Sequence, residues 1–133
     1  MQIEHIAIWT HDLEAMREFY TKFFHGTANT KYVNKKKNFS SCFISYQSGA
    51  RLELMSMPGI LENHNNSGDQ HYGLIHFSFE VGDQNDVDSL TEEIRSAGHP
   101  VIDGPRVTGD GYYESTILDP EGNRIEIACT VNK

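Results

Sequence analysis

Two five-residue segments of the chain share one pattern and indicate a duplicated structural unit. The segment RIEIA (124–128) reads as a strand in which Glu126 stands between two core-facing isoleucines, and RLELM (51–55) repeats it with Glu53 in the same frame. Because successive side chains of a strand point to opposite faces, both glutamates lie opposite the apolar residues that flank them. A chain built from two copies of one unit is therefore expected.

A second pair of segments extends the repeat toward the start of each copy. The segments IEHIAIW (3–9) and LIHFSFEV (74–81) align His5 with His76, and an aspartate stands seven residues after each histidine. The second segment alternates clearly between apolar and polar positions, which predicts a strand with the histidine on the polar face. Each copy thus begins with a histidine-bearing strand and ends with a glutamate-bearing strand.

An amphipathic helix is predicted after each of these first strands. Asp12 is expected to cap the first helix and Asp83 or Asp86 the second, while Gly26 and Gly98 are expected to end them. Apolar residues at a spacing of three and four form one stripe on each helix. The stripes are Leu13, Met16, Phe19, Tyr20 and Phe23 in the first helix and Val87, Leu90, Ile94 and Ala97 in the second.

The remaining apolar segments read as strands and complete two βαβββ modules in one α+β domain. These segments are 30–33 and 39–46 before RLELM, and 101–107 and 112–118 before RIEIA. Residues 119–123 carry the Asp, Pro, Gly and Asn typical of a tight turn. The modules are expected at about 1–56 and 73–133, joined by a polar linker (57–72) that is long enough to be a lid.

Composition excludes several classes of protein. A chain of 133 residues with 38% apolar residues fits one domain with a real core, and its net charge of −8 argues against a nucleic-acid or anionic-membrane surface. The lysine cluster at 31–37 is read as a solvated hairpin loop, with a site for an anionic substrate tail as the alternative. Cys42 and Cys129 are expected in the core, and the absence of a basic leader or long apolar run predicts a cytoplasmic, soluble protein.

Four residues form a candidate metal-ligand set. His5 and Glu53 lie 48 residues apart, and His76 and Glu126 lie 50 apart. If the two copies pair about a pseudo-twofold axis, these two imidazoles and two carboxylates meet in one cavity and suit Ni, Zn, Co, Mn or Fe, with waters completing the coordination.

Each of these residues also has an ordinary structural explanation. A lone strand histidine is more often a hydrogen-bonded core or cavity residue, and a lone strand glutamate usually faces solvent. A metal site that straddles a duplication, however, requires both types at equivalent positions of both copies. No chemical role is expected for His11, His25 and His99, which flank the helices. His64 and His71 of the linker are expected to be exposed loop residues, with an approach to the substrate as the alternative.

Three motifs resemble the vicinal oxygen chelate superfamily, which includes glyoxalase I, methylmalonyl-CoA epimerase, extradiol dioxygenases, fosfomycin-resistance enzymes and bleomycin-binding proteins. The motifs are EHIAIWTHDLEAMREFYTKFF (4–24), GLIHFSFEV (73–81) and DPEGNRIEI (119–127). The resemblance implies paired βαβββ modules whose curled sheets form a metal cup, and a homodimer. It also places the His, Glu, His, Glu ligand set of glyoxalase I on the same four residues, His5, Glu53, His76 and Glu126.

The resemblance implies a metal-dependent glyoxalase I-like (lactoylglutathione lyase-like) lyase or isomerase. Such an enzyme moves a proton beside a carbonyl through a metal-stabilised enediolate, on a thiol hemithioacetal or related oxo compound. Glu126 is the expected main base, with Glu53 as its partner. Glyoxalase I typically has an arginine and an asparagine where this chain has Trp9 and Met57. A thiol other than glutathione, or another small oxo or hydroxy acid, is the alternative substrate.

The presence of Glu53 argues against the dioxygenases and fosfomycin-resistance enzymes, which use three ligands. A methylmalonyl-CoA epimerase-like enzyme is the nearest alternative, because GPR (104–106) resembles its second module, although the DPE at 119–121 departs from its closing loop. A small-molecule binding protein without turnover would not need the ligand set. A purely structural metal site usually favours Cys and His.

Trp9, Met55 and Ser78 share the predicted faces of the ligands and are expected to line the substrate space. A purely core position is the alternative for Trp9.

Overall fold

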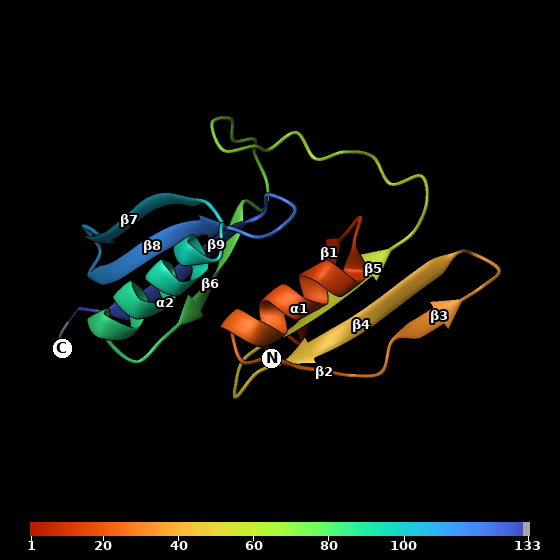
Figure 1. Cartoon of the computed structure of the whole chain (residues 1–133), viewed down its shortest axis with the longest axis horizontal. Coiled ribbons are helices and arrows are strands. Elements are labelled where there is room, and N and C mark those ends of the chain that lie inside the picture. Colours follow the sequence, from red (N-terminus) through yellow and green to blue (C-terminus); the bar gives the residue numbers. More distant parts are fainter. Residues whose placement is uncertain (132–133) are drawn as a thin grey trace. The chain divides into compact units, whose positions relative to one another are not determined.

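The computed structural model describes residues 1–131 and forms two compact units, one spanning residues 1–62 and the other beginning at residue 63 (Figure 1). Each unit contains one helix and one mixed sheet. Neither sheet closes into a barrel, because the strand order of each is linear. The predicted α+β fold of two tandem modules is confirmed at this level.

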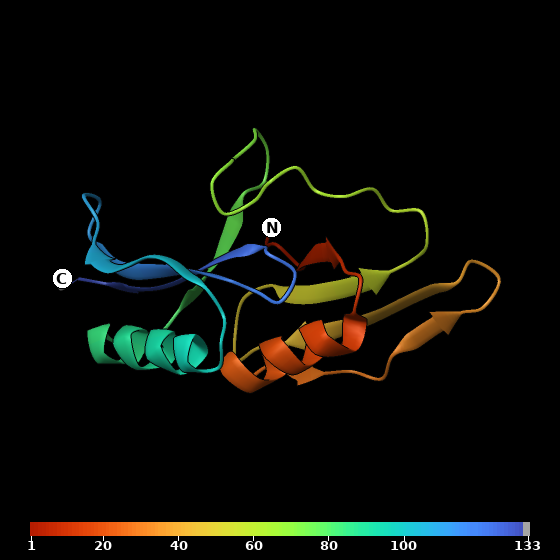
Figure 2. The ribbon, with the colours of Figure 1, turned by 45° about the horizontal axis from the view of Figure 1, so that its top comes forward.

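The first unit has one helix and five strands. They are β1 (His5–Trp9), α1 (Leu13–Phe23), β2 (Thr27–Ala28), β3 (Tyr32–Asn34), β4 (Phe39–Ser45) and β5 (Arg51–Ser56). The strand order is β1-β5-β4-β2, with β3 also pairing with β4, and β1 runs parallel to β5. Figure 2 shows α1 lying along one face of this sheet.

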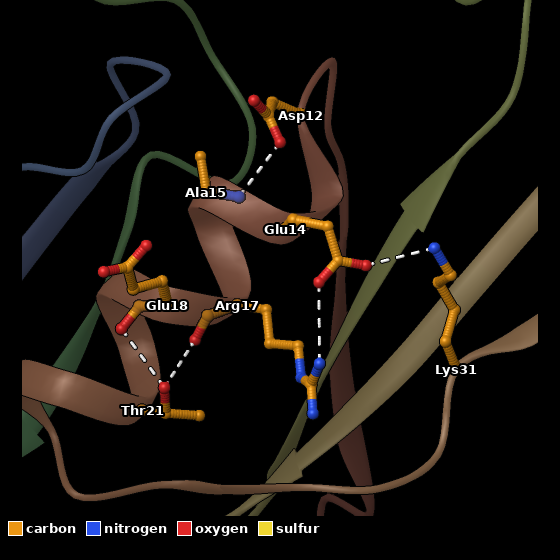
Figure 3. A network of polar contacts seen from close by, with 7 residues as sticks. All are labelled: Asp12, Glu14, Ala15, Arg17, Glu18, Thr21 and Lys31. Carbon is orange, nitrogen blue, oxygen red and sulfur yellow. Dashed lines mark hydrogen bonds and ion pairs between the residues drawn. The ribbon is translucent and has the colours of Figure 1, made fainter.

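The predicted apolar stripe of α1 is confirmed, since all five of its residues are buried. The Asp12 carboxylate accepts a hydrogen bond from the Ala15 backbone N–H at 2.9 Å, which caps the first turn (Figure 3). On the solvent side, Glu14 pairs with Arg17 and Lys31. The Lys31 ammonium hydrogen-bonds to Glu14 and lowers the pKa of that carboxyl.

The end of α1 differs from the prediction. His25, and not Gly26, adopts the left-handed conformation with φ 54°. Gly26 is required for space instead, because a Cβ there would lie 2.3 Å from Ile44 Cγ2. Sequence spacing alone does not separate a glycine needed for its backbone angle from one needed for close packing.

The strand expected at residues 30–33 corresponds to the shorter β3, and the two-residue strand β2 before it was not predicted. Asn29 lies between them, and its side-chain Oδ1 accepts a hydrogen bond from Phe43 N at 2.8 Å. The Asn29 backbone N–H donates to Phe43 O at 2.9 Å. A side-chain oxygen thus replaces a backbone carbonyl in the ladder with β4, which interrupts the regular strand.

The described residues of the second unit form one helix and four strands. They are β6 (His76–Glu80), α2 (Gln84–Ser96), β7 (Val101–Val107), β8 (Tyr112–Leu118) and β9 (Arg124–Thr130), and the strand order is β6-β9-β8-β7. Strand β6 runs parallel to β9. The turn between β8 and β9 is held by Asp119, whose carboxylate accepts from the backbone N–H groups of Glu121 and Asn123 at 2.9 Å each.

Helix α2 begins with a full capping box. The Asp83 side chain accepts from Asp86 N at 3.1 Å, and the Asp86 side chain accepts from Asp83 N at 3.2 Å. Both candidates for the cap therefore take part.

The apolar stripe of α2 is only partly as predicted, since Ala97 is exposed and Thr91 is buried in its place. The Thr91 hydroxyl lies 2.6 Å from Val87 O and 2.6 Å from Ser115 Oγ on β8, which makes a polar residue acceptable at a helix–sheet contact.

The two sheets repeat each other residue by residue, which confirms the duplication. His5 pairs with Arg51 across β1 and β5, and His76 pairs with Arg124 across β6 and β9. Two residues further along each strand, Glu53 is opposite Ala7 and Glu126 is opposite Ser78.

No helix or strand occurs between β5 and β6, residues 57–75, in the part of the chain that the structure describes. Within the second unit, Arg124 Nη2 donates to Ser67 O at 3.3 Å. The proposed lid function of this linker stays a prediction.

Cys42 and Cys129 are buried and free, as expected. None of the described helices is long and apolar enough to cross a membrane.

Candidate metal-binding site

The first unit brings His5 and Glu53 together on one face of its sheet. Leu52 and Leu54, which flank Glu53, are 2% and 0% exposed on the face that α1 covers. Because side chains alternate along a strand, Glu53 points to the opposite face. His5 Nε2 lies 3.7 Å from Glu53 Oε2, and the side chains are 41% and 16% exposed.

The second unit forms an equivalent pair from His76 and Glu126. Ile125 and Ile127 are fully buried on the helix-covered face, so Glu126 points to the other side. His76 Nε2 lies 3.2 Å from Glu126 Oε1, and the side chains are 40% and 18% exposed. The near-equal exposure of corresponding residues shows that the two pairs are equally accessible to solvent.

The chemistry of each pair fits a divalent ion of the first transition series. Each offers one imidazole nitrogen and one carboxylate, and each has an open side toward solvent. Among residues 1–131, no group of three or more His, Cys, Asp and Glu side chains is placed to hold a metal ion. We call each of the two pairs, His5 with Glu53 and His76 with Glu126, a half-site.

Aromatic side chains surround the half-site of the first unit. Trp9 pairs in register with Met55, two positions beyond Glu53 on the same face. The Trp9 and Phe39 rings meet edge to face at 6.2 Å, and Tyr32 contacts Phe39 at the same centroid distance. Trp9 is 41% exposed, so it is not a core residue of this unit.

Charged side chains surround the half-site of the second unit. Ser78 and Thr116 pair in register with Glu126, and Glu114 pairs with Arg106. Burial and then the negative Glu126 raise the pKa of the Glu114 carboxyl. The position of the first unit that corresponds to Glu114 is Ser41, as the pairing of each with the last strand shows.

Asp103 holds Arg106 in place. Asp103 Oδ2 lies 2.9 Å from Arg106 Nε and 2.6 Å from Arg106 Nη2. The Arg106 hydrogen bond lowers the pKa of Asp103. The bulges of β7 bring both residues to the same face as Glu114 and Thr116. Sequence reasoning did not select Glu114, because its role depends on its register with β9 and not on a motif of its own.

The other histidines form different contacts. His11 Nε2 lies 3.1 Å from Glu62 Oε1. His64 and His71 of the linker have ring centroids 5.9 Å apart, and His71 also contacts Asn65. None of these contacts includes a member of either half-site.

A family model matches residues 2–127 and decides which family this arrangement represents. The chain belongs to the glyoxalase/bleomycin resistance protein/dioxygenase superfamily. None of the curated proteins compared with the chain matches it.

Solved structures of the glyoxalase superfamily share the fold at low sequence identity. A trypanothione-dependent glyoxalase I from Leishmania major is 22% identical over 96% of this chain and 85% of its own, with a TM-score of 0.74. A glyoxalase family protein from Bacillus cereus is 14% identical over 99% and 95%, with a TM-score of 0.83. A glyoxalase I mutant from Zea mays is 20% identical, with a TM-score of 0.77, and this chain matches 45% of its length.

Proposed function

We propose that this chain is a metal-dependent, glyoxalase I-like lyase or isomerase that moves a proton beside a carbonyl group. Its substrate is a thiol hemithioacetal or a related small oxo compound. The observation that carries the proposal is the pair of half-sites, His5 with Glu53 and His76 with Glu126, at identical register positions of both units. The glyoxalase I neighbours support the same reading through the fold.

A divalent ion such as Ni, Zn, Co, Mn or Fe, held by His5, Glu53, His76 and Glu126, would stabilise the negative charge that develops on the substrate oxygens as the proton leaves. The two histidines then act as ligands only. Glu126 takes the proton from carbon, its carboxylate forming the new O–H bond, and returns it to the adjacent carbon. Trp9, Met55 and Ser78 line the substrate space.

Glu126 is assigned as the main base because more ionisable side chains lie near it than near Glu53. Glu114, Arg106 and Asp103 share its face of the sheet, whereas Glu53 is opposite Phe43 in β4. A proton taken up by Glu126 therefore has a second carboxyl nearby, and Glu53 has none on β4. Glu53 serves as the partner carboxylate.

An epimerase acting on acyl-CoA esters is the second candidate, since it requires the same proton transfer beside a carbonyl. Arg106, the last residue of the GPR motif, supports it by placing a guanidinium on the same face as Glu126. Assays with hemithioacetals of several thiols and then with acyl-CoA epimers separate the two candidates.

Metal content tests the proposal directly. The dialysed protein should contain about one transition metal ion per chain by elemental analysis, and a His5→Ala/Glu126→Ala variant should contain none. His11→Ala is the matched control, because this histidine pairs with Glu62 outside both half-sites. A native protein that takes up no metal even after reloading would overturn the enzyme proposal and favour a small-molecule binding protein.

Mixing two inactive variants then assigns the half-sites to chains. We expect a homodimer, and a His5→Ala/Glu53→Ala protein and a His76→Ala/Glu126→Ala protein each lack one half-site. If each metal site uses half-sites of different chains, a mixed dimer regains one intact site and part of the activity. If each site lies within one chain, mixing restores nothing.

A further inference from the structure

His5 has carboxylates near both of its ring nitrogens. Its Nε2 faces Glu53 at 3.7 Å, while its Nδ1 is in hydrogen-bond contact with Glu4 Oε2. In the second unit, His76 faces Glu126 through Nε2, and no second contact of this kind is present at His76 among the described residues. The residue that corresponds to Glu4 there is Ile75, which has no polar side chain.

Glu4 is itself fixed from the other side by Arg51. The Arg51 guanidinium donates to Glu4 Oε1, and the Arg51 backbone N–H donates to Glu4 O at 2.9 Å. The guanidinium also lies 4.1 Å from the centroid of the Phe43 ring, and that ring meets His5 edge to face at 5.4 Å. Glu4, His5, Phe43 and Arg51 thus form a closed ring of contacts beside Glu53.

These contacts select one tautomer of neutral His5. A distance of 3.7 Å is too long for a hydrogen bond from Nε2 to Glu53, whereas Nδ1 is in contact with Glu4. The proton therefore resides on Nδ1 and is donated to Glu4, which leaves the Nε2 lone pair directed to the side where Glu53 lies. Metal-binding histidines commonly use this arrangement, in which a carboxylate behind the ring orients it and increases its basicity as a ligand.

We propose that Glu4, held by Arg51, is a positioning residue that fixes His5 as the Nδ1–H tautomer and so makes the first unit the stronger metal half-site. The inference rests on the proposed function in that it takes His5 as a metal ligand. It adds an asymmetry that the duplicated ligand positions do not reveal. His76 lacks the corresponding carboxylate, so the half-site that contains Glu126 would be oriented less firmly than the half-site of the first unit.

Long-range ¹⁵N correlation spectra of the imidazole rings in metal-free protein, recorded where histidines are neutral, test the tautomer. His5 should carry its proton on Nδ1 in the wild type, and Glu4→Ala should move it toward Nε2, with Glu4→Gln intermediate. His76 is an internal reference that should not change. A His5 proton that stays in place in Glu4→Ala would reduce Glu4 to a surface partner of Arg51 and overturn the inference.

Metal titration of the same variants gives the second readout. Glu4→Ala should weaken affinity about 10- to 100-fold, while Glu62→Ala, which removes the exposed carboxylate beside His11, should leave it unchanged. Equal affinity in Glu4→Ala and wild type would also overturn the inference, although the proposed function would stand. A wild-type protein that binds no metal overturns the proposed function instead, and the tautomer measurement still decides the role of Glu4.

Discussion

The two glutamates of the half-sites are equivalent in the sheet but differ in their neighbours. Glu126 shares its face with Glu114 and Arg106, whereas Glu53 is opposite the Phe43 ring. The duplication therefore supplies two equivalent glutamates in two different environments. The two copies have therefore diverged in the residues that surround each glutamate.

Glu126→Gln should keep the fold and reduce turnover at least a hundredfold, because an amide does not accept the proton that the carboxylate takes. Turnover is measured at saturating metal with the hemithioacetal that the wild type uses best. Glu80→Gln is the control and should remain active. Glu80 is an exposed carboxylate on the same face of the sheet, two residues beyond Ser78 on β6. Wild-type turnover in Glu126→Gln would remove this residue from the mechanism.

The pH dependence of stability should reveal Glu114. Its pKa is raised above the ordinary value of 4.5, first by burial and then by Glu126. The folded state therefore binds the Glu114 proton more tightly than the unfolded chain does. The stability that this proton contributes is fully present below pH 4.5 and is lost as the pH rises through the raised pKa. Arg106 and His76 oppose the shift, while Asp110 adds to it.

In the presence of a metal chelator, Glu114→Gln should be as stable as wild type at low pH and more stable than wild type at pH 7. Urea unfolding at both pH values measures the difference. A variant that is less stable at pH 7 than wild type would show that the charged form of Glu114 is favoured in the fold.

At the scale of the elements, the helices were predictable because both signals that define them are local. The apolar stripe of α1 follows from a spacing of three and four, and Asp12 caps it through Ala15. The end of α1 and the break at Asn29 were not predictable, because both depend on packing or pairing with β4. Exposed Ala97 and buried Thr91 show the same limit, since the hydrogen bond that makes Thr91 acceptable in the core is made to Ser115 of β8.

Asp83→Ala should destabilise the protein by about 1–2 kcal/mol, because it removes the capping box that joins Asp83 and Asp86 at the start of α2. Glu93→Ala, an exposed change in the same helix, should alter the free energy of unfolding by less than about 0.5 kcal/mol. Denaturant unfolding followed by circular dichroism compares them. Equal stabilities would mean that packing alone, through Val87 and Ile94, determines this helix end.

At the scale of the whole molecule, the proposed metal ion would link the two kinds of unit thermodynamically. The half-sites lie in different compact units, and each supplies only two candidate ligands. An ion that binds only when His5 and Glu53 of one unit and His76 and Glu126 of the other are folded stabilises the native state by mass action.

Metal at one hundred times its dissociation constant should stabilise the native protein by about 2.7 kcal/mol, which raises the melting temperature by on the order of 10 °C. A chelator should reverse the shift. The His5→Ala/Glu126→Ala variant should melt at the same temperature with and without metal, and an equal shift in both proteins would place the ion at a different site.

The sequence by itself determined the duplication, the helices and the positions of His5, Glu53, His76 and Glu126, because periods of two and of 3.6 residues are local properties of the chain. The tertiary structure alone decided which residues surround those four. Glu4 reaches His5 with support from Arg51, a residue 47 positions away in the chain, and Glu114 reaches the face of Glu126 through the register of β8 with β9. Such neighbours depend on strand pairing between distant segments, which side-chain periodicity does not encode.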